Sequence, residues 1–226
     1  MNIKVIGAVS DTHGDLPDVP SHLDILMHAG DVCPDWSRNS AWNQGQWLDS
    51  HVRAWLEDHK MPTVATWGNH DWVGMANIQP ILPWTMLIDK PAEVGGLKIW
   101  GTPWTKRFSN WAFMDDEEGL DEKFRKIPAD LDIMIVHGPP FGHVDDGMRE
   151  DGLGSKALLA HIMRAKPSIV ICGHIHEAKG DSSIDHANGR RTYIHNVSMV
   201  DLTYRRYSGP PVKTIIYDLD TRQEVD

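Results

Sequence analysis

Five short apolar runs in this chain each lead into a cluster of aspartate, histidine or asparagine, and this pattern constrains the fold most strongly. The clusters are Ser10-Asp11-Thr12-His13-Gly14, His28-Ala29-Gly30-Asp31, Trp67-Gly68-Asn69-His70-Asp71, Val136-His137-Gly138-Pro139-Pro140 and Cys172-Gly173-His174-Ile175-His176. Each run before a cluster has strand length and contains β-branched or other strand-forming residues. The carboxyl ends of parallel strands lie at one edge of a sheet, where open α/β sheets bind ligands. We therefore expect the five clusters to meet at one site.

Strand and helix patterns alternate along much of the chain, which predicts an α/β fold. The expected strands are Ile3–Val9, Ile25–Ala29, Thr63–Thr66, Leu97–Trp100, Leu131–His137, Ile169–Cys172, Tyr193–Asn196 and Val212–Asp218. The expected helices are Gln46–His59, Asp115–Lys126 and Ser155–Ala165, the last with Ser155 as its N-cap. Asn188-Gly189 is a hairpin signal between Ile184 and Tyr193. Together these patterns indicate a layered α/β sandwich of mixed sheets, in a single domain that spans residues 1–226.

The charge of the chain argues against nucleic acid as a partner. Its 22 basic and 32 acidic side chains give a formal net charge of 22 − 32 = −10, and the sequence contains no block of lysine or arginine. Affinity for nucleic acid depends on basic patches that neutralise phosphates. An acidic protein that handles phosphate needs positive charge from another source, and bound metal can supply it.

The apolar segments and the cysteines predict a cytoplasmic protein. No apolar run approaches the ~18 residues that a membrane span requires, so we expect no membrane partner. The apolar run at the N-terminus is too short for a signal peptide and has no small-residue cleavage site. The two cysteines, Cys33 and Cys172, cannot form a disulfide framework, so we expect both to be reduced. The sequence predicts no particular oligomeric state.

The side chains in the five clusters are of the types that bind divalent cations. Carboxylate, imidazole and amide oxygen suit ions such as Mn²⁺, Fe²⁺ or Zn²⁺. Alternate residues of extended backbone share a face, so Asp11 and His13 can reach one site, as can His174 and His176. A single histidine in such a place is more often a hydrogen-bonded core residue. Five ordered clusters favour a dinuclear metal site instead.

With these motifs the chain resembles the calcineurin-like metallophosphoesterase superfamily, whose signature is D-x-H, G-D, G-N-H-[DE], H and G-H-x-H. All five elements occur in order between Asp11 and His176. Within that superfamily the chain is similar to small metallophosphoesterase-domain proteins with phosphodiesterase activity. This second likeness rests on His137-Gly-Pro-Pro-Phe-Gly142 with Asp145, Cys172-Gly-His-Ile-His-Glu177, and the stretch from Gly101-Thr-Pro-Trp104-Thr105 to Trp111-Ala-Phe113. The resemblance covers essentially the whole chain.

The resemblance implies a fold and a role for each motif residue. The fold would be an α/β-β-α sandwich with two mixed β-sheets flanked by helices, and the metal site would lie at the carboxyl ends of strands. Asp11, His13 and His176 would bind the first metal, Asn69, His137 and His174 the second, and Asp31 would bridge both. His70 would protonate the leaving alkoxide or stabilise charge on it, and Asp71 would orient His70. The cofactors would be two divalent ions, Mn²⁺ first, with Fe, Zn, Ni and Co as alternatives.

The implied reaction is hydrolysis of a small-molecule phosphodiester or phosphomonoester, with cyclic nucleotides among the candidates, by in-line attack of a metal-activated water. Ser/Thr protein phosphatases carry an arginine in G-D-x-V-D-R-G. Here Gly30-Asp31 is followed by Val32-Cys33-Pro34-Asp35, which argues against that activity. Two alternatives stay open. The net charge disfavours a nuclease of the same superfamily, and the intact set of ligands disfavours an inactive scaffold.

Other residues near the motifs are expected to support the site rather than to bind metal. We expect His28, Asp145 and Asn196 to pack beside the ligands or to hydrogen-bond to them. The aromatic residues Trp104, Phe108 and Trp111 are consistent with either a pocket wall or the core.

Overall fold

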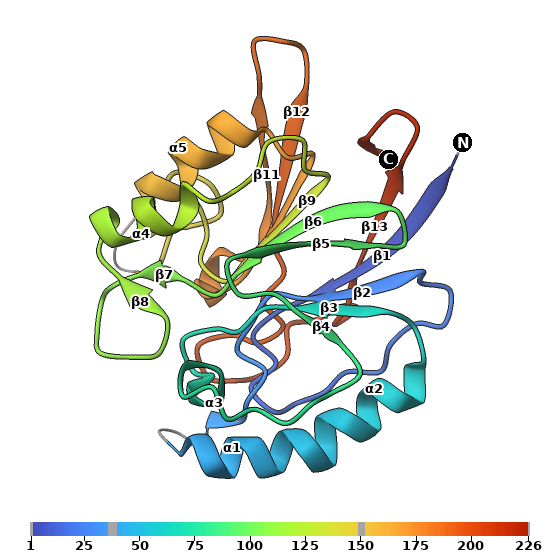
Figure 1. Ribbon diagram of the computed structural model, residues 1–226, viewed down its shortest axis with the longest axis vertical. Coiled ribbons are helices and arrows are strands. Elements are labelled where there is room, and N and C mark those ends of the chain that lie inside the picture. Colours follow the sequence, from blue (N-terminus) through green and yellow to red (C-terminus); the bar gives the residue numbers. More distant parts are fainter. Residues whose placement is uncertain (1, 36–39, 149–151, 226) are drawn as a thin grey trace.

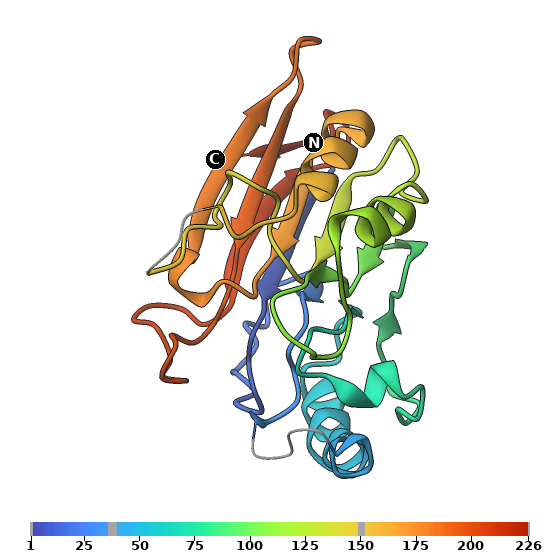
Figure 2. The ribbon, with the colours of Figure 1, turned by 90° about the vertical axis from the view of Figure 1, so that its left-hand side faces the viewer.

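The computed structural model describes residues 2–35, 40–148 and 152–225. Two six-stranded sheets lie face to face, and helices cover their outer faces (Figures 1 and 2). The expected α/β class, a layered sandwich of two mixed β-sheets flanked by helices, is therefore confirmed. None of the helices in the described ranges combines the length and the apolar character that a bilayer crossing needs.

The first sheet has the strand order β14-β13-β1-β2-β3-β4. Its strands are β1 (Ile3–Val9), β2 (Ile25–His28), β3 (Thr63–Ala65), β4 (Thr85–Met86), β13 (Lys213–Asp218) and β14 (Gln223–Val225). Strands β1 to β4 are parallel, whereas β13 pairs antiparallel with β1 and β14 pairs antiparallel with β13. Every residue of β2 and β3 is buried because both faces of the sheet are covered. Such strands show continuous apolar runs rather than alternation, which is why sequence alone revealed them.

The second sheet has the strand order β11-β12-β10-β9-β6-β5. Its strands are β5 (Lys90–Val94), β6 (Leu97–Thr102), β9 (Ile133–Val136), β10 (Ile169–Cys172), β11 (Gly180–Asp185) and β12 (Arg191–Asn196). The inner strands β6, β9, β10 and β12 are parallel, and the edge strands β5 and β11 are antiparallel to their neighbours. Two short strands, β7 (Thr105–Lys106) and β8 (Met114–Asp115), form a separate small sheet.

The sheets are held together by an apolar core between them, and the helices cover the outer faces. The central core includes the fully buried Ile6, Val64, Ile99, Ile135 and Ile171. Beside the first sheet lie α1 (Ala41–Trp47), one π-helical turn (Leu48–Val52), α2 (Arg53–His59) and the single turn α3 (Trp72–Met75). Against the second sheet lie α4 (Glu117–Phe124) and α5 (Lys156–Ala165).

The predicted helices occur, with shifted boundaries. The helix expected over Asp115–Lys126 spans Glu117–Phe124, because Asp115 lies in β8 and Asp116 caps the helix. Ser155 caps α5, because its hydroxyl accepts a hydrogen bond from the Leu158 N–H at 3.1 Å. The helix expected from Gln46 begins earlier, at Ala41, after the capping residue Ser40. The predicted hairpin joins β11 to β12 through a loop in which the Gly189 N–H donates to the His186 carbonyl at 2.9 Å. Gly189 has a φ of +80°, a conformation that favours glycine.

Strand β11 was expected only through its hairpin turn, without a range. Several shorter elements were not predicted: β4, β5, β7, β8, β14, α3 and the 3₁₀ turn His176–Ala178. Strand β5 is the longest of them and forms an edge of the second sheet, with Lys90, Pro91 and Glu93 exposed. An exposed edge strand tolerates charge and proline, so it shows no apolar run. The others have four residues or fewer, too short for a periodic pattern.

The two sheets are joined by backbone contacts next to the motif loops. After β12 the chain crosses from the second sheet to the first. There the Ser10 N–H donates to the Val197 carbonyl at 3.2 Å, and the Met199 N–H donates to the Ser10 carbonyl at 2.8 Å. Within the second sheet, the Gly173 N–H donates to the His137 carbonyl at 2.9 Å. These bonds place the carboxyl ends of strands from both sheets at one edge of the sandwich.

Candidate metal centre

The loops after β1 and β2 are paired with each other, and this pairing positions three motif residues. The Asp11 N–H donates to the Gly30 carbonyl, and the His13 N–H donates to the Asp31 carbonyl, each at 3.0 Å. Asp11, His13 and Asp31 all have left-handed backbone, with φ of 53°, 45° and 54°. Non-glycine residues seldom adopt this conformation, and when they do it is often at functional sites.

A first group of donors surrounds Asp11. His176 Nε2 lies 3.3 Å from Asp11 Oδ1 and 3.4 Å from His13 Nε2. Side-chain donor atoms of Asp11, His13 and His176 all lie within 4.8 Å of one another. The Asp11 carboxylate also accepts hydrogen bonds from the backbone N–H of His174 at 3.0 Å and from the Ser198 hydroxyl at 2.8 Å. It is therefore held by the segments that follow β10 and β12 of the second sheet.

A second group of donors surrounds Asp31 and His137. His137 Nε2 lies 3.3 Å from Asp31 Oδ2 and 2.9 Å from Asn69 Oδ1. The His174 ring packs against the His137 ring with 5.1 Å between centroids. Asp31 Oδ2 also lies 3.9 Å from His13 Nε2, so this carboxylate stands between the two groups. The structure thus brings together all seven candidate ligands, and their individual roles stay predictions.

His70 lies beside these groups, but its carboxylate partner differs from the one expected. His70 Nδ1 is 3.1 Å from Asp35 Oδ1, and its Nε2 is 4.0 Å from Asp31 Oδ2. The carboxylate of Asp71 instead accepts hydrogen bonds from the backbone N–H groups of Gly68 at 2.8 Å and Cys33 at 2.9 Å. The expectation that Asp71 orients the His70 ring is therefore wrong. Its carboxylate holds the two motif loops together.

Burial and charge shift the titration of these groups in opposite directions. Burial would lower the pKa of His137, but the carboxylates of Asp31 and Asp11 and the bond to the Ala29 carbonyl together outweigh it and raise that pKa to about 9. Burial would likewise lower the pKa of His176, but the carboxylates of Asp11 and Asp31 and the bond to the Asp201 carbonyl together raise it to about 9. Burial lowers the pKa of His13 to about 4 and that of His174 to about 3. Burial, reinforced by Asp31, raises the pKa of Asp71 to about 6.

The donor atoms fit divalent cations. His137 Nδ1 donates to the Ala29 carbonyl at 2.9 Å, so Nε2 of the neutral ring carries a lone pair. That lone pair faces oxygens of Asn69 and Asp31, and such atoms repel one another unless a proton or a cation lies between them. The Asp31 carboxylate favours a proton at this place, which is one reason why the pKa of His137 is raised. Imidazole, carboxylate and amide oxygen together match the preferences of Mn²⁺, Fe²⁺ or Zn²⁺.

Two of the three residues expected to support the site, His28 and Asn196, make hydrogen bonds to the motif loops. His28 Nδ1 accepts from the Gly30 N–H at 3.2 Å, and its Nε2 lies 3.2 Å from the Thr12 hydroxyl. Asn196 donates to the Ile175 carbonyl at 2.8 Å, between the two histidines of the last motif. Asp145 instead accepts hydrogen bonds from the backbone N–H groups of Gly142 and Gly154, each at 2.9 Å, and so holds its own loop.

Four contacts at the site were not predicted from the sequence. Asp35 contacts His70, and Ser198 donates to Asp11. The Asp201 carbonyl accepts from His176 Nδ1 at 3.2 Å, and the Tyr204 and His13 rings lie 4.7 Å apart, centroid to centroid. No motif marks these residues. The three aromatic residues have different environments. Trp104 is partly buried and packs against the core, whereas Trp111 contacts His70 and Phe108 contacts His174.

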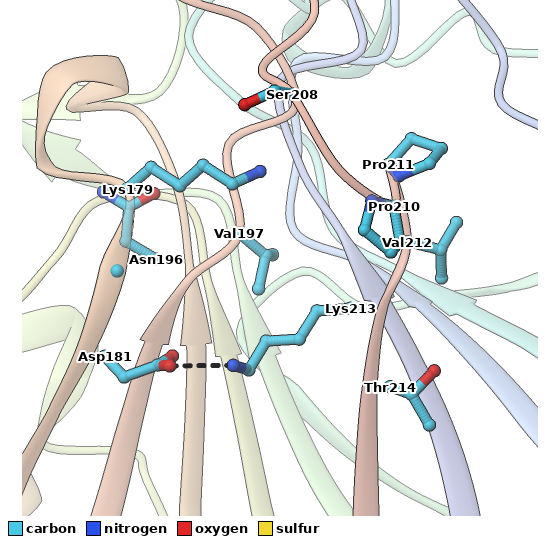
Figure 3. Close-up of a pocket in the computed structure, with 11 residues that line it drawn as sticks. Lys179, Asp181, Asn196, Val197, Ser208, Pro210, Pro211, Val212, Lys213 and Thr214 are labelled. Atoms are coloured by element: carbon cyan, nitrogen blue, oxygen red, sulfur yellow. Dashed lines mark hydrogen bonds and ion pairs between the residues drawn. The ribbon is translucent and has the colours of Figure 1, made fainter.

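Two cavities lie near the motif loops. One of about 450 Å³ opens beside His174 and is lined also by Phe108 and Leu202. The other, of about 480 Å³, lies between β13 and strands β11 and β12, and Figure 3 shows Lys179 and Lys213 pointing into it. Among the described residues that line this second cavity, none is a candidate ligand or His70. The cavity beside His174 is therefore the one that adjoins the candidate metal centre.

Comparisons with known proteins agree with this geometry. Residues 4–178 match the family model described as Calcineurin-like phosphoesterase. The chain is 28% identical over 240 residues to Metallophosphoesterase domain-containing protein 1 of Homo sapiens, covering 94% of this chain and 70% of the relative. Its fold matches a solved structure, TT1561 of Thermus thermophilus, with a TM-score of 0.62 at 14% identity, covering 99% and 98% of the two chains. At that identity the match shows the fold alone.

One relative carries a different name. The chain is 30% identical over 196 residues to "Probable rhamnogalacturonate lyase C" of Emericella nidulans. The alignment covers 79% of this chain but only 18% of that relative. Because the chain spans less than a fifth of that protein, the name does not transfer to the matching segment.

Proposed function

Because this chain belongs to the calcineurin-like phosphoesterase family, we propose that it is a dinuclear-metal-dependent phosphoesterase. The substrates would be small-molecule phosphodiesters or phosphomonoesters, with cyclic nucleotides among them. One observation carries the proposal: two sets of metal donors meet around two buried carboxylates. His176 Nε2 is 3.3 Å from Asp11 and His137 Nε2 is 3.3 Å from Asp31.

The geometry supports a division of the ligands between two ions, with Mn²⁺ as the first choice. The first ion would be held by Asp11, His13 and His176, and the second by Asn69, His137 and His174. Asp31 would bridge them, because its Oδ2 lies 3.3 Å from His137 Nε2 and 3.9 Å from His13 Nε2. Two such ions, when bound, withdraw charge from phosphate oxygens and lower the pKa of an attacking water.

His70 is the residue that we assign to the leaving group. Its Nδ1 faces Asp35, so Nε2 is the atom turned towards Asp31 and the ligand groups. The Trp111 ring lies 4.3 Å from the His70 ring, centroid to centroid, and restricts its rotation. A proton held at Nε2 can pass to the departing alkoxide, and histidine is the side chain that enzymes use most often for such a transfer.

We further propose that residues 1–226 form a single metallophosphoesterase domain and that the protein is cytoplasmic. Strand β13, which follows the segment matched by the family model, pairs with β1 over six residues and so belongs to the same sheet. Both cysteines are buried and free, and free thiols are the usual state in a reducing compartment.

Metal reconstitution tests the proposed function. Metal-stripped protein should gain activity towards bis-p-nitrophenyl phosphate or p-nitrophenyl phosphate when Mn²⁺ is added, and the ratio of the two rates gives the preference for diester or monoester. Asp31→Asn should lose both activity and bound metal, because the bridging charge is gone. Asp185→Asn, which changes an exposed carboxylate on β11, is the matched control and should behave as wild type. Absence of metal-dependent turnover of both esters would refute the proposal.

A further inference from the structure

One loop sends two aromatic side chains to different parts of the candidate metal centre. The loop between β7 and β8 carries both Phe108 and Trp111. The Trp111 ring contacts His70, which lies with His13 and Asp31. The Phe108 ring lies 5.6 Å from the His174 ring, centroid to centroid, and His174 packs on His137. The two rings therefore stand over different donor groups.

Phe108 is unusually exposed for its size, and so is a residue that shares its cavity. The exposed fractions are 66% for Phe108 and 53% for Leu202, and both line the cavity of about 450 Å³ beside His174. Leu153 and Ile175 add further apolar wall. Large apolar side chains left open around a polar centre are typical of a ligand-binding surface.

The charged residues of the cavity suit an aromatic group attached to a phosphate. Lys106 and Arg107 line the same cavity, beside Glu177. The Arg107 guanidinium is already engaged, because it donates to the Met114 carbonyl at 3.2 Å and to Asp115 at 3.3 Å. Lys106 therefore supplies positive charge next to an apolar wall. A flat ring that carries an anion matches this combination better than an alkyl chain or a second phosphate does.

We propose that this cavity holds the aromatic substituent that stays on phosphorus when a phosphodiester is cleaved, with Phe108 as the specificity-determining residue. The inference rests on the proposed function. In the reaction a water oxygen bonds to phosphorus, one phosphorus–oxygen ester bond breaks, and the departing alkoxide takes a proton. That departing oxygen must face His70. Phe108 contacts His174 instead, so a ring stacked on Phe108 belongs to the ester bond that remains intact.

Two diesters with the same leaving group separate this role from general damage. Bis-p-nitrophenyl phosphate and methyl p-nitrophenyl phosphate both release p-nitrophenol and differ only in the retained group. Phe108→Ala should lower kcat/KM for the bis-aryl ester by about tenfold, as expected for loss of one stacked ring. It should change kcat/KM for the methyl ester by less than about twofold. Phe108→Tyr should preserve the preference. Trp42→Ala is the matched control, because Trp42 is an aromatic residue on α1 that is 69% exposed. It should change kcat/KM for neither substrate.

An equal fall in kcat/KM for both esters, or no fall for either, would overturn the inference. A binding measurement keeps the test independent of turnover. Mn²⁺-loaded wild type should bind phenyl phosphate about tenfold more tightly than methyl phosphate by calorimetry, and Phe108→Ala should lose this preference. If wild type cleaves neither diester but keeps the phenyl preference, the proposed function fails and only the binding of an aromatic phosphate in this cavity stands. If it cleaves both without a Phe108-dependent preference, the assignment fails and the function stands.

Discussion

A single methyl group at Gly68 should disable the candidate metal centre without changing any charge. Gly68 lies two residues before His70, and its backbone passes directly over Asp31. A Cβ added at Gly68 would overlap Asp31 Oδ1, and would lie 2.5 Å from the Asp31 backbone nitrogen and 2.7 Å from its Cγ. Gly68 does not have left-handed backbone, so the conflict in Gly68→Ala is steric.

The structure sets the size of the effect. Ordinary contacts of a Cβ begin at 3.4 Å, so the Asp31 carboxylate must retreat by about 1 Å. A displacement of that size in a catalytic group costs about 10²-fold in rate. Overpacking typically costs about 1–3 kcal/mol in the free energy of unfolding, out of a total of about 5–15 kcal/mol. Gly68→Ala should therefore stay folded, lose bound metal and lose at least about 10²-fold in turnover.

Gly45→Ala is the matched control, since the nearest atoms to its added Cβ lie at 3.8 Å. Gly45 is inside α1, where alanine is favoured by up to about 1 kcal/mol, so this variant should be at least as stable as wild type and fully active. Elemental analysis, turnover of bis-p-nitrophenyl phosphate and urea denaturation measure the three effects. Wild-type metal content together with turnover within about threefold in Gly68→Ala would refute the reasoning about Asp31.

Two further predictions concern single histidines. For a diester with an alkoxide leaving group, His70→Ala should lower turnover by about 10²–10⁴-fold and leave metal content unchanged in elemental analysis, because the ring protonates the leaving group. A small loss with that ester would remove His70 from the mechanism. His195 lies 2.7 Å from Asp181 and 2.8 Å from Glu224, and although burial opposes it, these bonds raise the His195 pKa above 6.5. Protonated His195 thus stabilises the fold below its unfolded pKa, and this contribution disappears as the pH rises through its folded pKa. His195→Gln should therefore lower the free energy of unfolding by about 1–2 kcal/mol more at about pH 5.5 than at about pH 9, as measured by urea denaturation. Equal losses of unfolding free energy at the two pH values would contradict this.

Much of the fold could be predicted because its central strands are buried on both faces. A strand covered on both sides is mostly apolar, so β2, β3, β9 and β10 are visible as nearly continuous apolar runs. Edge strands escape this rule. Strand β5 has one side open to solvent and carries charged residues and a proline, so nothing local distinguishes it from a loop.

The sequence by itself determined which residues could form the site, because polar side chains that follow buried strands at their carboxyl ends converge wherever the strands are parallel. Only the tertiary structure decided how they are used. Asp35, not Asp71, faces His70, and Ser198 reaches Asp11 across 187 positions of chain. The cavity at Phe108 likewise combines segments from distant parts of the chain. Such contacts depend on how two sheets and their connecting loops pack, and local sequence periodicity carries no information about distances between separate segments.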